Sequence, residues 1–99
     1  MEVNLNCDLG EKSKHYSGIN DQALIEIINT ANIACGYHAG SESVIETTIK
    51  IAKENSVSIG AHPGFADKEN FGRKRIELEK NELKKIIRDQ LEILSLIHI

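Results

Sequence analysis

The chain has 99 residues, enough for one small domain and too few for two. Its 15 acidic and 12 basic residues give a formal net charge of −3, and no basic cluster is denser than the Arg-Lys-Arg triplet at residues 73–75. Because a nucleic-acid-binding surface usually shows a basic stripe or an excess of positive charge, this composition argues against nucleic acid as a partner.

The amino-terminal sequence and the cysteines indicate a cytoplasmic protein. The first residues, MEVN, contain neither a basic stretch nor a following apolar run, so we expect no signal peptide and no membrane span. Cys7 and Cys35 lie in predicted strands rather than in a CxxC or metal-finger spacing. We therefore expect buried free thiols in a reducing compartment, although a disulfide is conceivable if the two strands are neighbours.

The first predicted strand covers residues 2–7, where apolar and polar residues alternate. Its apolar face comprises Val3, Leu5 and Cys7. Asn4, Asn6 and Asp8 follow on the other face, where polar groups are costly unless paired. Alternation alone suits an antiparallel strand, but a helix follows each predicted strand, and this favours parallel strands joined by crossovers. A polar face inside such a sheet indicates a site.

Residues 10–18 are polar and irregular, which predicts a loop over the end of the first strand. A short helix follows, with Asn20 or Asp21 as its predicted N-cap. Its apolar positions, at helical spacing, are Leu24, Ile27 and Ile28.

The second predicted strand, residues 31–35, leads directly into the turn GYHAG at residues 36–40. An apolar run that ends in two glycines predicts a buried strand followed by a tight turn. That turn is expected to place His38 at the end of the sheet.

The next helix is predicted to begin at Ser41, or at Ser43 with Glu46 three residues later, and to end at Asn55. Its apolar side comprises Val44, Ile45, Thr48, Ile49 and Ala52.

The third predicted strand covers residues 57–61, has His62 in phase with its polar face, and ends at Pro63-Gly64. A loop then leads to the last helix, predicted over residues 79–97. The apolar stripe of this helix comprises Leu83, Ile86, Ile87, Leu91, Leu94 and Ile97, widened by Ile93 and Leu96.

Three consecutive strand-helix units are therefore predicted, which indicates an α/β fold with parallel strands. Right-handed crossovers place the carboxyl ends of such strands on one side, where sites in these folds lie. Asp8, His38 and His62 each stand at or just after a strand end. We expect these three side chains to meet there.

Three motifs carry a resemblance to a known family. They are MEVNLNCDLGE at residues 1–11, NIACGYHAG at residues 32–40, and IGAHPGF at residues 59–65 followed by FGR. In this order and spacing they resemble the amino-terminal part of the LamB/YcsF family, the A subunit of bacterial ATP-dependent 5-oxoprolinase. The resemblance covers nearly all of the 99 residues.

The resemblance implies a fold and an activity. The fold is a partial (β/α) barrel of the glycoside hydrolase/deacetylase type, so we expect residues 1–99 to form a single incomplete domain, truncated and inactive alone. The activity is ATP-dependent hydrolysis of 5-oxo-L-proline to L-glutamate, performed together with two other 5-oxoprolinase subunits. ATP is therefore an expected cofactor and 5-oxoproline the expected substrate.

Two chemical roles suit the three converging residues. Asp8, His38 and His62 can act as ligands of a divalent metal, as an Asp-His-His site does in the related deacetylases. Without a metal, His62 can act as general base on a water while Asp8 orients it. We expect Asp8 and His62 to be catalytic and His38 to bind substrate. The alternative is structural, because a histidine at a strand end often only hydrogen-bonds a loop, and an aspartate before Leu-Gly can simply form a turn.

Further substrate-binding candidates are Asn6, Asn32 and Arg73. Inward-facing amides can hold a lactam or a carboxylate, and a guanidinium can pair an anion through two hydrogen bonds. The alternatives are amides that satisfy neighbouring backbone groups and an arginine that is only solvated.

Two other functions stay open at this point. The chain can be a non-enzymatic module that self-associates, because three βα units leave two sheet edges unpaired. It can also be a metal-dependent, deacetylase-like hydrolase acting on an acylated sugar.

Overall fold

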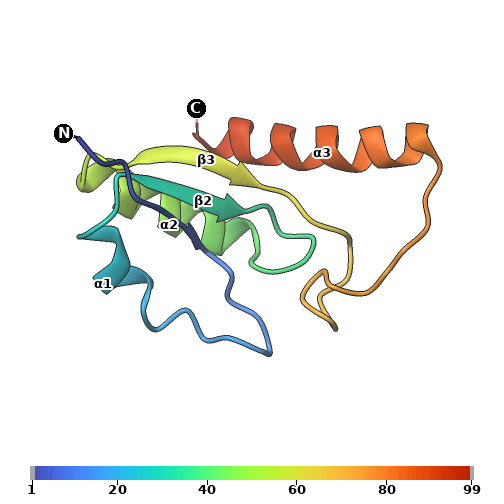
Figure 1. Ribbon diagram of the computed structural model, residues 1–99, viewed down its shortest axis with the longest axis horizontal. Helices are drawn as coiled ribbons and strands as arrows, with labels where there is room; N and C mark the ends of the chain where they lie inside the picture. Colours follow the sequence, from blue (N-terminus) through green and yellow to red (C-terminus); the bar gives the residue numbers. More distant parts are fainter. Residues whose placement is uncertain (1, 99) are drawn as a thin grey trace.

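All predicted strands and helices form, and the three strands pair in parallel in the order β1-β2-β3 (Figure 1). The computed structural model describes residues 2–98. The prediction of an α/β fold of three βα units with parallel strands is confirmed. The elements in chain order are β1 (Asn6–Leu9), α1 (Asp21–Ile25), β2 (Thr30–Ala34), α2 (Glu42–Glu54), β3 (Ser58–His62) and α3 (Lys80–His98).

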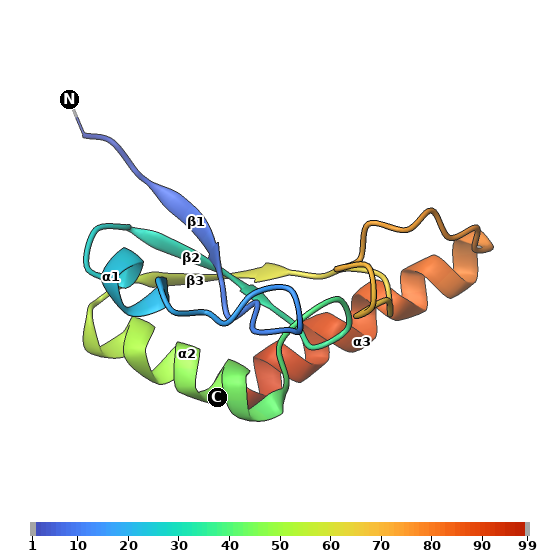
Figure 2. The ribbon, with the colours of Figure 1, turned by 90° about the horizontal axis from the view of Figure 1, so that it is seen from below.

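The register of the sheet decides which side chains share a face. Asp8 pairs with Asn32, and Asn32 pairs with Gly60. Because side chains alternate along a strand, these residues and His62 share the polar face, and the apolar residues between them share the other. Both long helices, α2 and α3, lie on the apolar side of the sheet (Figure 2). No helix within residues 2–98 covers the polar face.

The core lies between the apolar face of the sheet and α2. Its most deeply buried members include Leu9, Ala31, Ile33, Ile45, Ile49 and Ala52. The predicted N-cap of α2 is Ser41, whose Oγ accepts a hydrogen bond from the Val44 N–H at 3.3 Å. Ser43, the alternative cap, contacts the Ser41 hydroxyl instead, and Asn55 ends the helix as predicted.

The first strand begins later than predicted. β1 starts at Asn6, and Val3 and Leu5 are 66% and 49% exposed instead of facing a core. The register gives the reason, because Asn6 already pairs with Thr30, the first residue of β2. Leu5 still accepts hydrogen bonds from the Asn29 and Thr30 N–H groups, but the residues before Asn6 lie outside the paired strands and cover no core.

The first helix is shorter than its apolar pattern predicted. α1 ends at Ile25, which is buried, whereas Ile27 lies outside the helix and is 66% exposed. Asn20 occupies the N-cap position but makes no side-chain capping bond. The Asp21 carboxylate accepts hydrogen bonds from the Gly10 N–H at 3.0 Å and the Tyr16 hydroxyl at 3.4 Å. It thereby holds the loop that follows β1.

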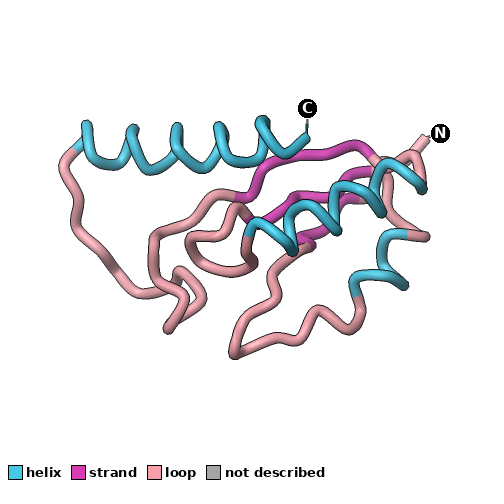
Figure 3. Tube along the Cα trace, turned by 180° about the vertical axis from the view of Figure 1, so that it is seen from behind, coloured by secondary structure: helices cyan, strands magenta, loops and turns pink. Residues whose placement is uncertain are grey.

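The last helix is only partly covered by the rest of the chain. A long connection leaves the end of β3, and α3 then runs back toward the sheet, reaching it only with its last turns (Figures 1 and 3). It packs against α2 there. Leu94 is buried, but Leu83 and Leu91 are 39% and 44% exposed, so the predicted apolar stripe is half buried. Like the other helices of residues 2–98, α3 is not apolar enough to cross a membrane.

One polar residue inside this stripe, Gln90, is fully buried. Its Oε1 accepts a hydrogen bond from the Gly64 N–H at 2.9 Å. Its Nε2 donates to the Gly64 carbonyl at 2.7 Å and to the Ile86 carbonyl at 3.1 Å. Gln90 thus ties α3 to the segment that follows β3, a contact that the apolar pattern did not predict.

Replacing Gln90 with leucine is expected to lower the free energy of unfolding by about 1–3 kcal/mol, because the Gly64 N–H and carbonyl lose their partners. Urea unfolding followed by circular dichroism measures the difference. The matched control is Gln22→Leu, at an exposed glutamine on α1, where a change within about 0.5 kcal/mol is expected. Equal losses in the two variants would contradict a special role for the buried amide.

Candidate active site

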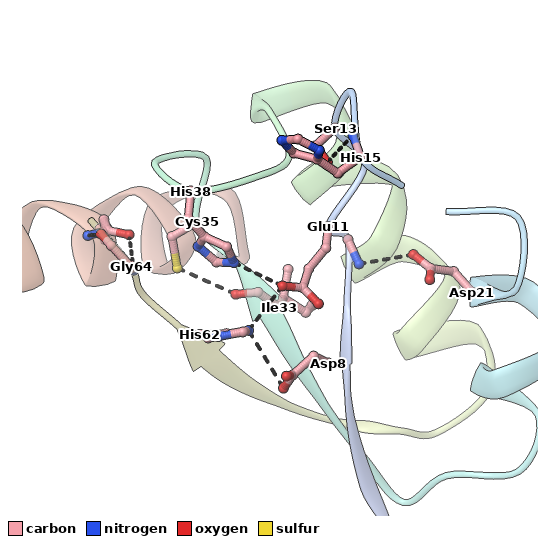
Figure 4. A network of polar contacts seen from close by, with 12 residues as sticks. Asp8, Glu11, Ser13, His15, Asp21, Ile33, Cys35, His38, His62 and Gly64 are labelled. Carbon is pink, nitrogen blue, oxygen red and sulfur yellow. Dashed lines mark hydrogen bonds and ion pairs between the residues drawn. The ribbon is translucent and has the colours of Figure 1, made fainter. Parts of the chain in front are cut away.

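Four ionisable side chains from the three βα units meet at the carboxyl ends of the strands (Figure 4). Asp8 lies near the end of β1, and Glu11 lies in the loop that follows it. His38 belongs to the turn between β2 and α2, and His62 is the last residue of β3. The structure therefore brings Asp8, His38 and His62 to one edge of the sheet.

The Glu11 carboxylate lies between the two imidazoles. Its Oε2 is 2.9 Å from His38 Nε2 and 3.7 Å from His62 Nδ1. His62 Nδ1 is also 3.6 Å from Asp8 Oδ1, and the two imidazole centroids are 4.6 Å apart. The side chains differ in exposure, from 3% for His38 and 12% for Glu11 to 51% for Asp8. Asp8 thus borders the site from the solvent side, and Glu11 occupies its interior.

Sequence reasoning missed Glu11, which it treated as an ordinary loop residue. Gly10 has a φ of +70°, so the chain turns directly after β1 and brings Glu11 over the strand ends. The available signal was an acidic residue within three positions of the strand end and next to a glycine. Such a residue stays close to the carboxyl edge whatever the course of the remaining loop.

Close backbone contacts fix the His38 ring. A Cβ on Gly64 would lie 2.6 Å from His38 Nδ1, and a Cβ on Gly72 would lie 2.6 Å from His38 Cβ. Only glycine leaves room at these two positions. The Phe71 ring meets the imidazole edge-on at a centroid distance of 5.5 Å. The imidazole is therefore held by packing as well as by its bond to Glu11.

Two buried imidazole nitrogens have no hydrogen-bond partner within residues 2–98. They are Nδ1 of His38 and Nδ1 of His62. His38 Nδ1 is packed against Gly64, whereas His62 Nδ1 faces two carboxylates, and an unpaired buried nitrogen in such a position indicates a place for a water or a metal. Of the two, His62 Nδ1 lies nearest to both carboxylates.

The predicted amides lie on the same face but bond each other. Asn32 Nδ2 donates to Asn6 Oδ1 at 3.0 Å, and Asn32 Oδ1 lies close to Gly60. Part of their hydrogen-bonding capacity is therefore already used.

Arg73 lies at the border of the site, where its guanidinium is 5.8 Å from the centroid of the Phe71 ring. A cavity of about 300 Å³ is lined by Arg73 together with Asp8, Glu11, His38 and His62.

The cysteines are free, as predicted, and are poor candidates for a nucleophile. Burial raises the pKa of the Cys35 thiol, against a smaller lowering by a backbone hydrogen bond at His62. Burial also raises the pKa of the Cys7 thiol, and the nearby Asp21 and Asp8 charges add to this effect. Since the thiolate is the reactive form, the chemistry of the site falls to carboxylates and imidazoles.

Comparisons with known proteins agree with this arrangement. A family model described as the LamB/YcsF family matches residues 3–98. The chain is 50% identical over 95 residues to the 5-oxoprolinase A subunit of Staphylococcus carnosus, and 47% identical to the protein of the same name from Staphylococcus epidermidis. Each match covers 96% of this chain and 38% of the relative, so the chain spans well under half the length of these curated relatives.

A solved structure has the same fold. The crystal structure of the lactam utilization protein from Thermus thermophilus matches 98% of this chain with a TM-score of 0.91 and 36% sequence identity. The match covers 39% of that protein.

Proposed function

The chain belongs to the LamB/YcsF family, and from this membership we propose that it forms part of a 5-oxoprolinase, which hydrolyses the lactam of 5-oxo-L-proline to L-glutamate. The observation that carries the proposal is the Glu11 carboxylate between two imidazoles at the strand ends. Opening an unstrained lactam adds water across the amide C–N bond. This reaction needs an activated water and stabilisation of the oxyanion that develops on the carbonyl.

His62 is the proposed general base. Its unpaired Nδ1 can accept the proton of an attacking water, and Asp8 and Glu11 lie close enough to stabilise the imidazolium that forms. The proton then passes to the leaving lactam nitrogen, so that a primary amine and a carboxylate result. His38, fixed against Glu11, is proposed to contact the substrate, and Asn6 and Asn32 stay candidates for holding its amide.

A divalent metal is the alternative to His62 as general base, because a nitrogen that binds a metal cannot accept a proton. One ligand atom each from Glu11, His38 and His62 lies within 4.8 Å of the others, and carboxylate with imidazole suits zinc and similar metals. The 3.7 Å separation of His62 Nδ1 and Glu11 Oε2 exceeds a hydrogen bond but fits two ligands of one cation with bonds of roughly 2.0–2.2 Å. When bound, the metal would supply a hydroxide at neutral pH.

Glu11→Gln is expected to weaken zinc binding more than about tenfold, because even residues that only support a ligand commonly contribute that much to metal affinity. Isothermal titration with Zn²⁺ measures the affinity independently of activity. Glu26→Gln, at an exposed position after α1, is the matched control and is expected to bind zinc like the wild type. Unchanged affinity in Glu11→Gln would contradict the proposed ligand set.

Further subunits are part of the proposal, because the relatives are named as the A subunit of 5-oxoprolinase. That there are two of them and that ATP is the cofactor is proposed from the family resemblance alone. The test is a chimera in which residues 3–98 replace the segment they match in the Staphylococcus carnosus protein. The chimera is assayed with its partner subunits, 5-oxoproline and ATP for release of glutamate, beside the 99-residue chain alone. We expect glutamate from the chimera and none from the chain alone. A chimera that folds but releases no glutamate would refute the proposal.

The same Glu11, His38 and His62 group supports a second enzymatic candidate, a metal-dependent hydrolase of acylated sugars. Acetate release from acetylated sugars, measured with and without added zinc, distinguishes this activity from lactam opening.

A self-associating module is the non-enzymatic candidate, because β1 and β3 are edge strands within residues 2–98. Light scattering measures the molar mass of the chain in solution, and a monomeric mass would contradict the self-associating module.

A further inference from the structure

A second pocket adjoins the cavity that holds the acid and histidine cluster. Its volume is about 780 Å³, and it shares Glu11, Phe71 and Arg73 with the smaller cavity. Lys74 and Tyr16 line its remaining wall together with His15, Glu69 and Asn70. A small molecule can therefore contact the catalytic cluster and this pocket at the same time, with Arg73 at the junction.

Two acids and two bases line this pocket, and they differ in whether they have partners. Each of the two acids has a partner, because Glu69 pairs with Lys14 and Glu11 with His38. The side chains of Arg73 and Lys74 form no ion pair within residues 2–98. The Asp67 carboxylate accepts a hydrogen bond from the Lys74 backbone N–H at 3.3 Å, and the Lys74 charge contributes to a lowered pKa of Asp67, so Lys74 is partly balanced. Arg73 has no carboxylate within ion-pair distance in residues 2–98 and is the cation of this pocket that can bind an anion.

The position of Arg73 connects that charge to the chemistry. Its guanidinium lies over the Phe71 ring, and the same ring contacts His38 edge-on. A guanidinium presents parallel N–H donors that match the two oxygens of a carboxylate, which an ammonium group does not. An anion bound at Arg73 would thus lie next to the ring that packs against His38, at the edge of the cavity that His38 and His62 line.

We infer that Arg73, assisted by Lys74, binds the carboxylate of the substrate and makes the site selective for lactams that carry one. This inference rests on the proposed function. It assigns the lactam ring to the smaller cavity and its carboxylate to the junction of the two pockets. A neutral lactam of the same ring size would forgo the ion pair and bind more weakly.

The test compares two probes, 5-oxo-L-proline and the neutral 2-pyrrolidinone, by ligand-observed NMR titration of the chain and of the chimera. The wild type is expected to bind 5-oxoproline about tenfold or more tightly than 2-pyrrolidinone, the ratio typical of one charge-assisted hydrogen-bonded pair. Arg73→Met is expected to remove this preference and to leave binding of 2-pyrrolidinone unchanged. Arg73→Lys should restore part of it, because the charge remains and the paired donors do not.

Arg75→Met is the matched control, since Arg75 lies two residues away, has an 89% exposed side chain and pairs with Glu77. It is expected to keep the full preference for 5-oxoproline. Equal binding of both probes by the wild type, an equal loss for both probes in Arg73→Met, or the same loss in Arg75→Met would each overturn the inference.

The inference and the proposed function fail in different ways. If the chimera releases glutamate but Arg73→Met keeps the preference and the KM of the wild type, only the carboxylate site is wrong. If binding is selective and depends on Arg73 but no lactam is opened, the proposed function is wrong and the carboxylate site stands.

Discussion

Replacing His62 with alanine is expected to slow lactam opening by the chimera by about 10²–10⁴-fold, the contribution typical of a general acid or base. The variant loses the only imidazole within residues 2–98 that approaches both carboxylates, Asp8 and Glu11, with the same nitrogen. Most of the effect should fall on kcat, because the proton transfer takes place in the transition state. The measurement is glutamate release at saturating 5-oxoproline and ATP.

His98→Ala is the control for this experiment. His98 is the exposed last residue of α3. Its backbone carbonyl accepts a hydrogen bond from Lys53 Nζ at 2.9 Å, and the substitution of the side chain leaves this bond in place. The control is expected to retain wild-type activity. A His62 variant with more than about a tenth of wild-type kcat would contradict the role of general base.

Replacing Gly40 with alanine is expected to lower the free energy of unfolding by roughly 2–5 kcal/mol, which combines left-handed backbone strain with overpacking. Gly40 has a φ of +79°, and an added Cβ would lie 2.6 Å from the Gly10 carbonyl oxygen. Its N–H also donates to the Lys12 carbonyl at 2.9 Å. Gly40 therefore joins the turn that carries His38 to the loop that carries Glu11, and urea unfolding measures what this junction contributes.

Gly36→Ala separates the two contributions. Gly36 has a φ of +91° in the same turn, but an added Cβ would have no neighbour within 4 Å. Only the backbone strain remains, so a loss of about 1–2 kcal/mol is expected. If Gly36→Ala and Gly40→Ala lowered the free energy of unfolding equally, the close approach of Gly40 to the Gly10 carbonyl would not contribute to stability.

Local patterns predicted the order and type of the elements well. Periodicity and capping residues fixed α2 closely, because Ser41 and Asn55 act through bonds to their own neighbours in the chain. The three motifs also indicated that Asp8, His38 and His62 lie at or just after strand ends. In a parallel sheet this is sufficient to bring them to one edge.

Features that depend on distant contacts were not predictable in the same way. Val3 and Leu5 alternate like core residues, but the register with β2 leaves them outside the sheet. Gln90 is buried only because Gly64, 26 residues earlier, offers it two backbone partners. Glu11 differs from these, because the turn at Gly10 that brings it into the site is local and the glycine next to an acidic residue was a readable signal that the loop assignment passed over.

The contact between Gln90 and Gly64 couples the last helix to the chemistry at the strand ends. The Gly64 backbone makes two of the three hydrogen bonds of the Gln90 amide, and a Cβ at Gly64 would lie 2.6 Å from the His38 ring. The position of α3 and the position of the His38 ring thus both depend on the backbone of this one glycine. Variants of the distant helix surface should be judged by their effect on turnover as well as on folding.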